Sequence, residues 1–324
     1  MSQDQLRTGV IGVGSMGRHH ARVYRELPET ELIGVADADS EAARAAADTY
    51  ETAAMGMEEL LDAVDAVSVA VPTPYHYETA SKALDRDTHV LVEKPFGDSL
   101  DAGRRLIDRA RERGLTLQVG HIERFNPAIR ALADIVPDLN VIAVDARRLG
   151  PPLDRDLQAS AVLDLMIHDL DILLALVGDD ATVTEAAGAA DGQYVTATVE
   201  LDDGVVGSLT ASRVTQQKVR ELSITAESCQ VHVDYISRSV QIHRHSIPEY
   251  IEENGDVRYR HENIVEHPTV DNGEPLKKEL AAFAEAIEEG TEPVVTGEDG
   301  LEALKLAREI EDEATETKQV TPKQ

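Results

Sequence analysis

The first 120 residues alternate short runs of β-branched residues with helix-like stretches, and this alternation constrains the fold more than any other feature of the chain. It is typical of parallel βαβ units, and it predicts a doubly wound parallel sheet of the Rossmann type. The strands that we expect are Thr8–Val13, Glu31–Ala36, Ala66–Val71, His89–Val92 and Leu115–Val119. The helices that we expect between them are Met16–Glu26, Ser40–Tyr50, Tyr77–Asp85 and Leu100–Arg113.

After Gly120 the strands follow one another with few helices between them, which predicts an α+β domain on a mostly antiparallel, open sheet. The turn Asp202-Asp203-Gly204 indicates a hairpin, and Ser160–Val177 reads as a helix that precedes most of the sheet. The strands that we expect are Val141–Arg148, Tyr194–Leu201, Val205–Ser212, Glu221–Thr225, Val231–Ile236 and Val240–His243.

The length of 324 residues favours two domains. We place a nucleotide-binding domain at residues 1–120 and a substrate and oligomerisation domain at residues 121–324. Two closing helices at residues 275–289 and 298–311, read from their apolar periodicity, are expected to pack back towards the first domain.

The chain has 61 acidic and 31 basic side chains, a net charge of −30. Such a surface repels phosphate backbones and anionic lipids, which argues against nucleic-acid and membrane partners. We interpret this acidic surface as halophilic, because about 1 M salt shortens the Debye length to roughly 3 Å and so screens the repulsion between its charges; an ordinary acidic enzyme is the alternative.

The single Cys229 excludes an internal disulfide. No secretory or membrane-spanning segment is visible, so we expect a cytoplasmic protein.

The segment Gly12-Val13-Gly14-Ser15-Met16-Gly17 follows the first expected strand and opens a helix. In this context Gly12 permits a tight turn, Gly14 lets a pyrophosphate approach the backbone, and Gly17 lets helix and strand pack closely. The free N–H groups of the helix start, from Ser15 and Met16 onwards, then face the phosphates. The pattern predicts a dinucleotide site.

Asp37 ends the second expected strand, 20 residues after Gly17, where an acid hydrogen-bonds the adenosine ribose. Its charge would repel a 2′-phosphate, and no Arg lies immediately beside it in the sequence, so we expect NAD rather than NADP. The alternative is a solvated loop acid.

Val92-Glu93-Lys94-Pro95 leaves a strand at its carboxyl end, where doubly wound sheets place ligands. Lys94 is one of only eight lysines, and its ammonium can hydrogen-bond a reacting oxygen and stabilise a developing alkoxide. A surface strand end is the alternative.

Asp164 and His168 are spaced i, i+4 on an otherwise apolar helix, with Asp171 three residues further on. A histidine with an ordinary pKa near 6.5 can take a hydroxyl proton, and a neighbouring carboxylate can fix its tautomer. A metal is the competing explanation, but neither an H-E-x-x-H motif nor a cysteine accompanies the cluster, so we expect none.

The whole chain resembles the glucose-fructose oxidoreductase, inositol dehydrogenase and MocA family of NAD(P)-dependent sugar oxidoreductases. The likeness implies that Lys94, Asp164 and His168 are catalytic, and that Met166 stands where the family often has a Gly. It also implies contacts to the cofactor from Pro72, Pro74, His76 and Glu93. The segments that carry it are Gly12–Gly17, Val71–His76, Glu93–Pro95, Asp164–Asp171, Glu274–Leu276 and Val294–Gly300.

Val119–Pro127 and Asp164–Asp171 look most like the nucleotide-sugar branch of this family, which includes UDP-N-acetylglucosamine 3-dehydrogenases. This implies oxidation of the sugar 3-hydroxyl. A diphosphate needs cations, and we expect a cluster of arginines at the cleft entrance; the alternative is that Arg147 and Arg148 pair with surface acids. The expected cluster is Arg124, Arg147, Arg148 and Arg155. The expected substrate contacts are Lys94, His121, Arg124, Arg148, Asp164 and His168.

Two other functions remain open at this point. One is a dehydrogenase of a free sugar or cyclitol of the inositol, glucose or xylose type, and the other is a non-catalytic NAD-binding regulator. An antiparallel sheet with one uncovered face often packs on another subunit, so we also expect a homo-oligomer.

Overall fold

The computed structural model describes residues 5–152, 160–178, 180–245, 249–253, 256–260 and 262–319. The chain divides into two compact units. The first contains residues 1–125 and 273–305, and the second contains residues 126–272 and 306–324. Residues 273–305, which we expected in the second domain, therefore cluster with the first, so the nucleotide-binding unit is discontinuous in sequence.

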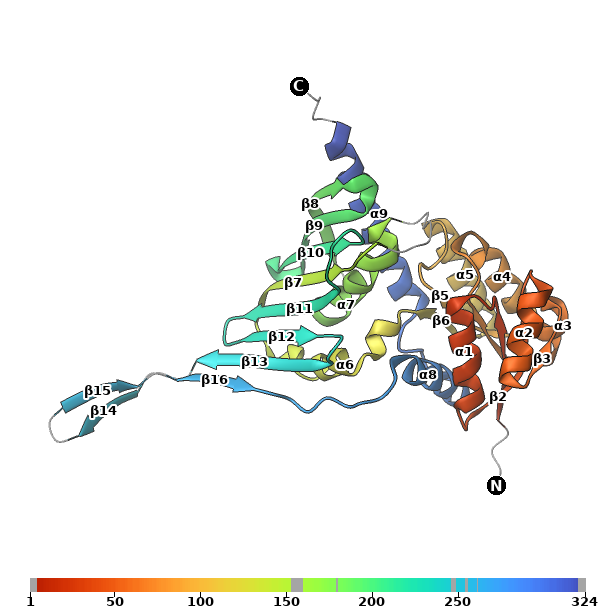
Figure 1. Ribbon diagram of the computed structural model, residues 1–324, viewed down its shortest axis with the longest axis horizontal. Coiled ribbons are helices and arrows are strands. Elements are labelled where there is room, and N and C mark those ends of the chain that lie inside the picture. Colours follow the sequence, from red (N-terminus) through yellow and green to blue (C-terminus); the bar gives the residue numbers. More distant parts are fainter. Residues whose placement is uncertain are drawn as a thin grey trace. The chain divides into compact units, whose positions relative to one another are not determined.

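The first unit contains a six-stranded parallel sheet in the order β3-β2-β1-β4-β5-β6 (Figure 1). The strand order reverses between β1 and β4, and doubly wound sheets bind ligands at the carboxyl ends of the strands beside such a point. The expected Rossmann architecture is confirmed, although the two-residue β3 had no visible signal. The strands are β1 Leu6–Ile11, β2 Thr30–Ala36, β3 Ala53–Ala54, β4 Ala66–Val69, β5 His89–Glu93 and β6 Leu117–Gly120.

Helices cover both faces of this sheet. One core contains Val10 and Leu91 of the sheet beneath α1, α2 and α8, and the other contains Ile11 and Val92 beneath α3, α4 and α5. Phe283 of α8 is fully buried in the first of these cores, which explains why the late segment belongs to this unit. The helices are α1 Ser15–Glu26, α2 Ser40–Tyr50, α3 Met57–Ala63, α4 His76–Leu84, α5 Leu100–Arg113 and α8 Pro275–Glu289.

The second unit contains an eight-stranded sheet in the order β16-β13-β12-β11-β7-β10-β9-β8. Its neighbouring strands pair antiparallel, except that β7 and β10 pair parallel. The expected turn Asp202–Gly204 does join β9 to β10. The strands are β7 Val141–Leu149, β8 Ala181–Ala189, β9 Tyr194–Leu201, β10 Val206–Ser212, β11 Val219–Ala226, β12 Gln230–Asp234, β13 Ser239–His245 and β16 Asn263–Glu266, beside a separate pair β14 Glu249–Glu253 and β15 Asp256–Arg260.

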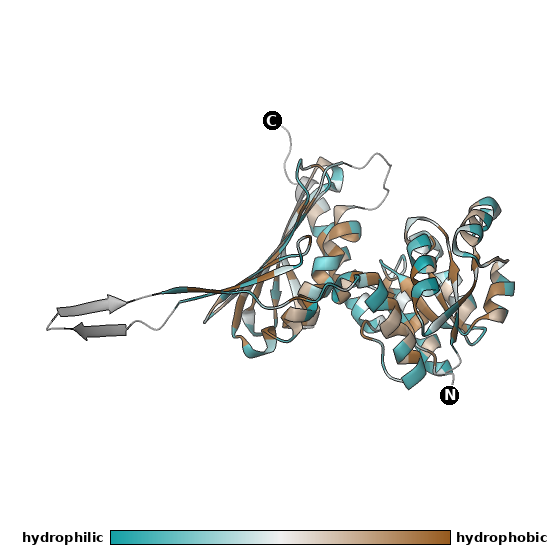
Figure 2. Cartoon of the chain, turned by 60° about the horizontal axis from the view of Figure 1, so that its bottom comes forward, coloured by the Kyte–Doolittle hydropathy of each residue, from teal (hydrophilic) through white to brown (hydrophobic). Residues whose placement is uncertain are grey.

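Among the residues that the structure describes, the helices of the second unit lie along one side of this sheet, as the nearly edge-on view shows (Figure 2). They are α6 Pro127–Ala133, α7 Ile167–Val177 and the later part of α9 Gly297–Gln319. The expected open sheet is confirmed. Within the described parts of the chain, no helix is long and apolar enough to cross a membrane.

Candidate active site

The glycine-rich turn joins β1 to α1, and its three glycines have different surroundings. Gly12 has φ +91°, and a Cβ there would lie 2.7 Å from the backbone of Ala70. A Cβ on Gly17 would lie 1.7 Å from the carbonyl oxygen of Gly12. A Cβ on Gly14 would meet no atom within 4 Å. Close packing within the chain therefore requires Gly12 and Gly17, whereas Gly14 leaves an open surface over the turn.

The start of α1 has the features of an anion-binding site. Its N-cap is Gly14, no side chain caps it, and its first turn contains no acid. By contrast, α2 is capped by Asp39 and α5 by Ser99, each of which accepts hydrogen bonds from the first turn of its helix. The first N–H groups of α1, including those of Ser15 and Met16, therefore remain open to a phosphate, which fits a bound dinucleotide.

Asp37 lies directly after β2 and touches the glycine-rich turn. Its carboxylate accepts hydrogen bonds from the amides of Val13, at 2.7 Å, and Asp39, at 2.9 Å. The side chain of Arg18 donates to the carbonyl oxygen of the same Val13 at 3.0 Å. Arg18, which is distant from Asp37 in the sequence, therefore lies beside the same turn, and the charge of Asp37 alone does not decide between NAD and NADP.

The loop after β4 is tied to the loop after β5 by His76. Its Nε2 lies 2.8 Å from the carbonyl oxygen of Val71, and its Nδ1 lies 3.0 Å from that of Pro95. The ring is 1% exposed, and this burial lowers the pKa of His76 despite both hydrogen bonds. His76 thus braces the two loops from inside, whereas Pro72 and Pro74 lie exposed on the loop surface.

Lys94 follows β5 immediately, at the same carboxyl edge of the sheet as the glycine-rich turn, and it is half-buried. The preceding Glu93 is 8% exposed, and its Oε1 accepts a hydrogen bond from His20 at 2.8 Å. Glu93 was expected to contact the cofactor, but its carboxylate is held inside the unit. Sequence reasoning missed His20, although it lies only three residues after Gly17.

The residues after β6 form the short helix η2, Ile122–Phe125. His121 is fully buried, and its amide donates to the carbonyl oxygen of Val119 at 2.8 Å. The Arg124 side chain is 14% exposed, and its Nη2 lies 3.5 Å from Oδ1 of Asp299. Arg124, which we expected to bind a diphosphate, is therefore already beside a carboxylate of its own unit.

In the second unit Asp164 lies in a π-helical turn, η4 Val162–Met166, which runs directly into α7. Such turns are frequent at functional sites. Oδ2 of Asp164 lies 3.6 Å from Nε of Arg213, a residue that is 4% exposed and follows β10. His168 is half-buried in the first turn of α7. Arg213 was not predicted, because it lies 49 residues after Asp164 and follows no motif.

Two members of the expected arginine cluster, Arg147 and Arg148, lie on opposite faces of the second sheet. Arg148 is 3% exposed, and its Nε and Nη2 lie 2.8 and 2.7 Å from the two carboxylate oxygens of Asp169. Arg147 lines a groove of about 530 Å³ on the sheet face that helices leave uncovered, beside Asp145 and His232. Successive strand residues point to opposite faces, so Arg147 and Arg148 cannot line one entrance, and that expectation is wrong. Arg155 lies outside the described residues.

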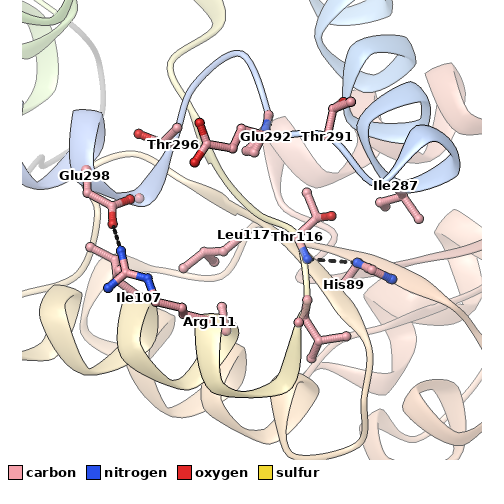
Figure 3. A pocket seen from close by; sticks show the side chains of 16 residues that line it. His89, Ile107, Arg111, Thr116, Leu117, Ile287, Thr291, Glu292, Thr296 and Glu298 are labelled. Atoms are coloured by element: carbon pink, nitrogen blue, oxygen red, sulfur yellow. Dashed lines mark hydrogen bonds and ion pairs between the residues drawn. The ribbon is translucent and has the colours of Figure 1, made fainter.

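A pocket of about 360 Å³ lies in the first unit at the amino ends of β5 and β6 (Figure 3). Arg111 pairs there with Glu298 at 2.6 Å, and the amide of Thr116 donates to Nδ1 of His89 at 2.9 Å. Because Lys94 follows the opposite end of β5, this pocket is not the predicted cofactor site. Among the described residues, no group of three His, Cys, Asp or Glu is arranged to hold a metal ion.

Comparisons with known proteins agree with this geometry. Residues 6–121 match the model of the oxidoreductase family with an NAD-binding Rossmann fold, and residues 152–321 match that of the family's C-terminal alpha/beta domain. UDP-N-acetylglucosamine 3-dehydrogenase of Acidithiobacillus ferrooxidans is 37% identical over 246 residues, covering 74% of this chain and 77% of that protein. An inositol 2-dehydrogenase/D-chiro-inositol 3-dehydrogenase of Lacticaseibacillus casei is 32% identical, covering 55% of this chain and 54% of that protein.

Solved structures show the same likeness over nearly the whole chain. The structure of the Acidithiobacillus ferrooxidans enzyme superposes with a TM-score of 0.86 at 32% identity, covering 96% of this chain and 98% of that one. The 3-ketoreductase KijD10 of Actinomadura kijaniata, at 23% identity and a TM-score of 0.79, shares the fold over 96% of this chain and 98% of its own. The chain belongs to the glucose-fructose oxidoreductase, inositol dehydrogenase and MocA family of oxidoreductases.

Proposed function

We propose that this protein is an NAD-dependent dehydrogenase that oxidises a secondary hydroxyl of a sugar, and specifically the 3-hydroxyl of a UDP-N-acetylglucosamine-type nucleotide sugar. The observation that best supports dehydrogenase activity is the start of α1, which has no side-chain cap and no acid in its first turn and lies at the same sheet edge as Lys94. The substrate is proposed from the 37% identical relative that is named for it.

The described residues fit a nicotinamide dinucleotide. The N–H groups at the start of α1 would hold the pyrophosphate, Asp37 the adenosine ribose, and the exposed Pro72 and Pro74 would lie towards the nicotinamide. When bound, the nicotinamide supplies the acceptor for the hydride. Asp37 remains our reason to propose NAD, and comparing Asp37→Ala with Arg18→Ala on both cofactors tests it. An unchanged NAD preference in Asp37→Ala would refute that role.

The chain's own groups perform the proton chemistry in this proposal. Lys94 donates a hydrogen bond to the reacting oxygen and stabilises its developing negative charge. His168 takes the hydroxyl proton, because a neutral imidazole is a suitable base near neutral pH. In this proposal Asp164 orients the base, and Nε of Arg213 lies 3.6 Å from Oδ2 of Asp164.

Absorbance of reduced nicotinamide tests the proposal directly. The purified protein is mixed with NAD and, one at a time, UDP-N-acetylglucosamine, N-acetylglucosamine, inositol, glucose and xylose. Reduction with the UDP-sugar at a kcat/KM at least about tenfold above that of the other sugars is expected. Reduction with none of them, while NAD still raises the melting temperature, would instead identify a non-catalytic NAD-binding regulator.

A free sugar or cyclitol is the second candidate, and the pairing of the arginines favours it. Arg124 and Arg148, expected to bind a diphosphate, lie beside Asp299 and Asp169 instead. The 32% identical relative is named as an inositol dehydrogenase. The salt dependence of KM distinguishes a UDP-sugar from a neutral sugar as the substrate, because the charge of −30 repels an anionic substrate most strongly at low ionic strength. The KM of a UDP-sugar should rise on dilution of salt before the fold is lost, whereas that of a neutral sugar should not.

We further propose that the protein works in the cytoplasm in concentrated salt, and that the uncovered sheet face packs on a second copy of the chain. The outer residues of β9 and β10 on that face include the uncharged Thr196, Thr198, Ser208 and Thr210, whereas Asp145 and Arg147 of the neighbouring β7 lie on the same face. Light scattering at high salt should give an oligomer. A monomer there, or an unchanged oligomer in Thr210→Arg, would contradict this interface.

A further inference from the structure

A row of polar side chains is buried beneath α1 and α8 in the first unit. Ser68 of β4, Glu93 of β5 and Gln118 of β6 are at most 8% exposed, although their strands are mostly apolar. They alternate with residues of the opposite core, so they face the side that α1 covers (Figure 1). Buried polar groups destabilise the fold unless they are hydrogen-bonded, so this row needs partners from the helices.

Helix α1 supplies those partners to Ser68 and Glu93. Nε2 of His20 lies 2.8 Å from Oε1 of Glu93, and its Nδ1 lies 2.9 Å from Oγ of Ser68. The hydroxyl of Tyr24, one turn further along α1, lies 2.9 Å from the same Oγ. His20, Tyr24 and Ser68 are all fully buried. One helix face therefore holds the polar residues of two adjacent strands.

The hydrogen-bond partners determine which way each proton points. A carboxylate only accepts, so Nε2 of His20 carries the proton given to Glu93. Burial raises the pKa of Tyr24, so its hydroxyl stays protonated. The Tyr24 hydroxyl lies 2.9 Å from Oγ of Ser68, and because Nδ1 of a neutral His20 can only accept, the Ser68 proton goes to that nitrogen. Tyr24 therefore donates to Ser68, Ser68 donates to Nδ1 of His20, and His20 donates to Glu93.

Glu93 is an anion in this arrangement. Burial by itself would raise its pKa, but the hydrogen bond from His20 and the nearby positive charge of Lys94 hold the pKa below its usual range. The adjacent strand makes room for the carboxylate at Gly120, where a Cβ would lie 3.1 Å from Oε2 of Glu93. A buried negative charge thus precedes Lys94 by one residue.

We propose that His20 is a positioning residue for Lys94: it holds the Glu93 carboxylate at the end of β5, and this anion keeps the Lys94 ammonium charged and in place. The pair also connects α1, whose first turn would bind the cofactor pyrophosphate, to the lysine that would bind the reacting oxygen. The inference rests on the proposed function only for the catalytic role of Lys94. The hydrogen bonds and the effect of Glu93 on the lysine do not depend on the substrate.

Four variants separate charge, hydrogen bonding and position. Glu93→Gln keeps an acceptor for His20 and removes the charge. His20→Ala removes the donor, whereas His20→Gln offers an N–H at a similar reach. His19→Ala is the matched control, because it is the adjacent, exposed histidine of the same helix.

Two measurements are made on each variant. The first is the pH dependence of Lys94 labelling by an amine reagent, read by peptide mass spectrometry, which needs no substrate. Glu93→Gln and His20→Ala should lower its midpoint by about one pH unit, because an opposite charge near an ammonium favours the charged form. The second is the pH profile of kcat, whose alkaline limb should move down by the same amount, with a loss of kcat that approaches about tenfold at pH values above both midpoints. His20→Gln should restore both values, and His19→Ala should match the parent.

An unmoved Lys94 midpoint in folded Glu93→Gln overturns the inference. So does a His20→Gln variant as impaired as His20→Ala, which would show that the histidine merely fills space. If His20→Ala does not fold, the Lys94 midpoint in Glu93→Gln still tests the inference, because glutamine has nearly the same shape as glutamate. A midpoint that shifts as expected in a protein that oxidises no sugar would support the pair and refute the proposed function.

Discussion

The polar groups at the two edges of the parallel sheet in the first unit differ in their hydrogen-bond and ion-pair partners. At the carboxyl edge, α1 begins without a side-chain cap, and His20 and Glu93 are buried together beside Lys94. At the amino edge, exposed charges pair with one another, as Arg111 does with Glu298. The carboxyl edge thus offers unoccupied donors and a fixed charge, whereas the amino edge satisfies its own groups. The difference indicates which edge is built for a ligand.

The largest expected effect is the loss of activity when Lys94, at the carboxyl edge, is replaced, compared with the replacement of an ordinary surface lysine. Lys94→Ala should lower kcat/KM about 10²–10³-fold, because one group that stabilises charge at the reacting oxygen is lost. Lys82→Ala is the control, since Lys82 pairs with Glu78 on the surface of α4. Steady-state kinetics and NADH fluorescence measure turnover and cofactor affinity. Equal losses in both variants would remove the distinction.

A second prediction concerns the uncapped start of α1. Gly14→Asp should cap the helix and stabilise the free protein by roughly a few tenths of a kcal/mol, because aspartate is a better N-cap than glycine and a Cβ there meets nothing. The same carboxylate should weaken NAD binding at least about tenfold, or about 1.4 kcal/mol, by occupying the N–H groups and repelling the pyrophosphate.

Gly56→Asp is the matched control for that substitution. Gly56 is also an uncapped N-cap, that of α3, with open space at its Cβ position. Calorimetric melting and titration with NAD should show unchanged NAD affinity in this variant. Weakened binding in Gly56→Asp, or full binding in Gly14→Asp, would mean that the start of α1 is not the pyrophosphate site.

The third prediction tests the amino edge through pH. Burial lowers the pKa of His89, and the nearby Asp65 opposes this only in part, so the folded state binds the proton less readily than the unfolded state. Stability should therefore fall as pH drops below the ordinary value of about 6.5. His89→Asn keeps an acceptor for the Thr116 amide and should reduce this loss by a few tenths of a kcal/mol, because half-exposed charges are screened.

Urea unfolding at pH 7.5 and pH 5.5 measures that difference. NAD affinity should not change in His89→Asn, because the residue lies at the other end of β5 from Lys94. A larger pH dependence in the variant than in the parent would contradict the sign of this effect.

The smallest expected effect is that of Arg111→Ala. Its partner Glu298 is 55% exposed and Arg111 itself is 70% exposed, so the pair should contribute less than about 0.5 kcal/mol. Thermal melting and sugar oxidation should both stay close to the parent. Loss of cofactor binding would show that the pocket of Figure 3 communicates with the carboxyl edge.

The parts of the fold and of the site that depend on residues close together in the sequence could be predicted. The helices 40–50, 100–113 and 275–289 were predicted with the bounds that the structure has, and Asp37 does lie against the glycine-rich turn. The sequence analysis missed α3, β3 and β8, because α3 and β3 are short and β8 is rich in Ala. The alternation of side chains along a strand already predicts that Arg147 and Arg148 face opposite ways, so this part of the site could have been predicted from the sequence.

The sequence by itself determined the alternating parallel architecture, the glycine-rich turn and the strand end that presents Lys94, because periodicity and turn geometry depend on residues a few positions apart. Only the tertiary structure decided which buried polar groups meet. His20 and Glu93 are 73 residues apart, and Arg148 and Asp169 belong to a strand and a helix. Their pairing follows from the need to satisfy every buried charge once the elements have packed, and no local pattern encodes it.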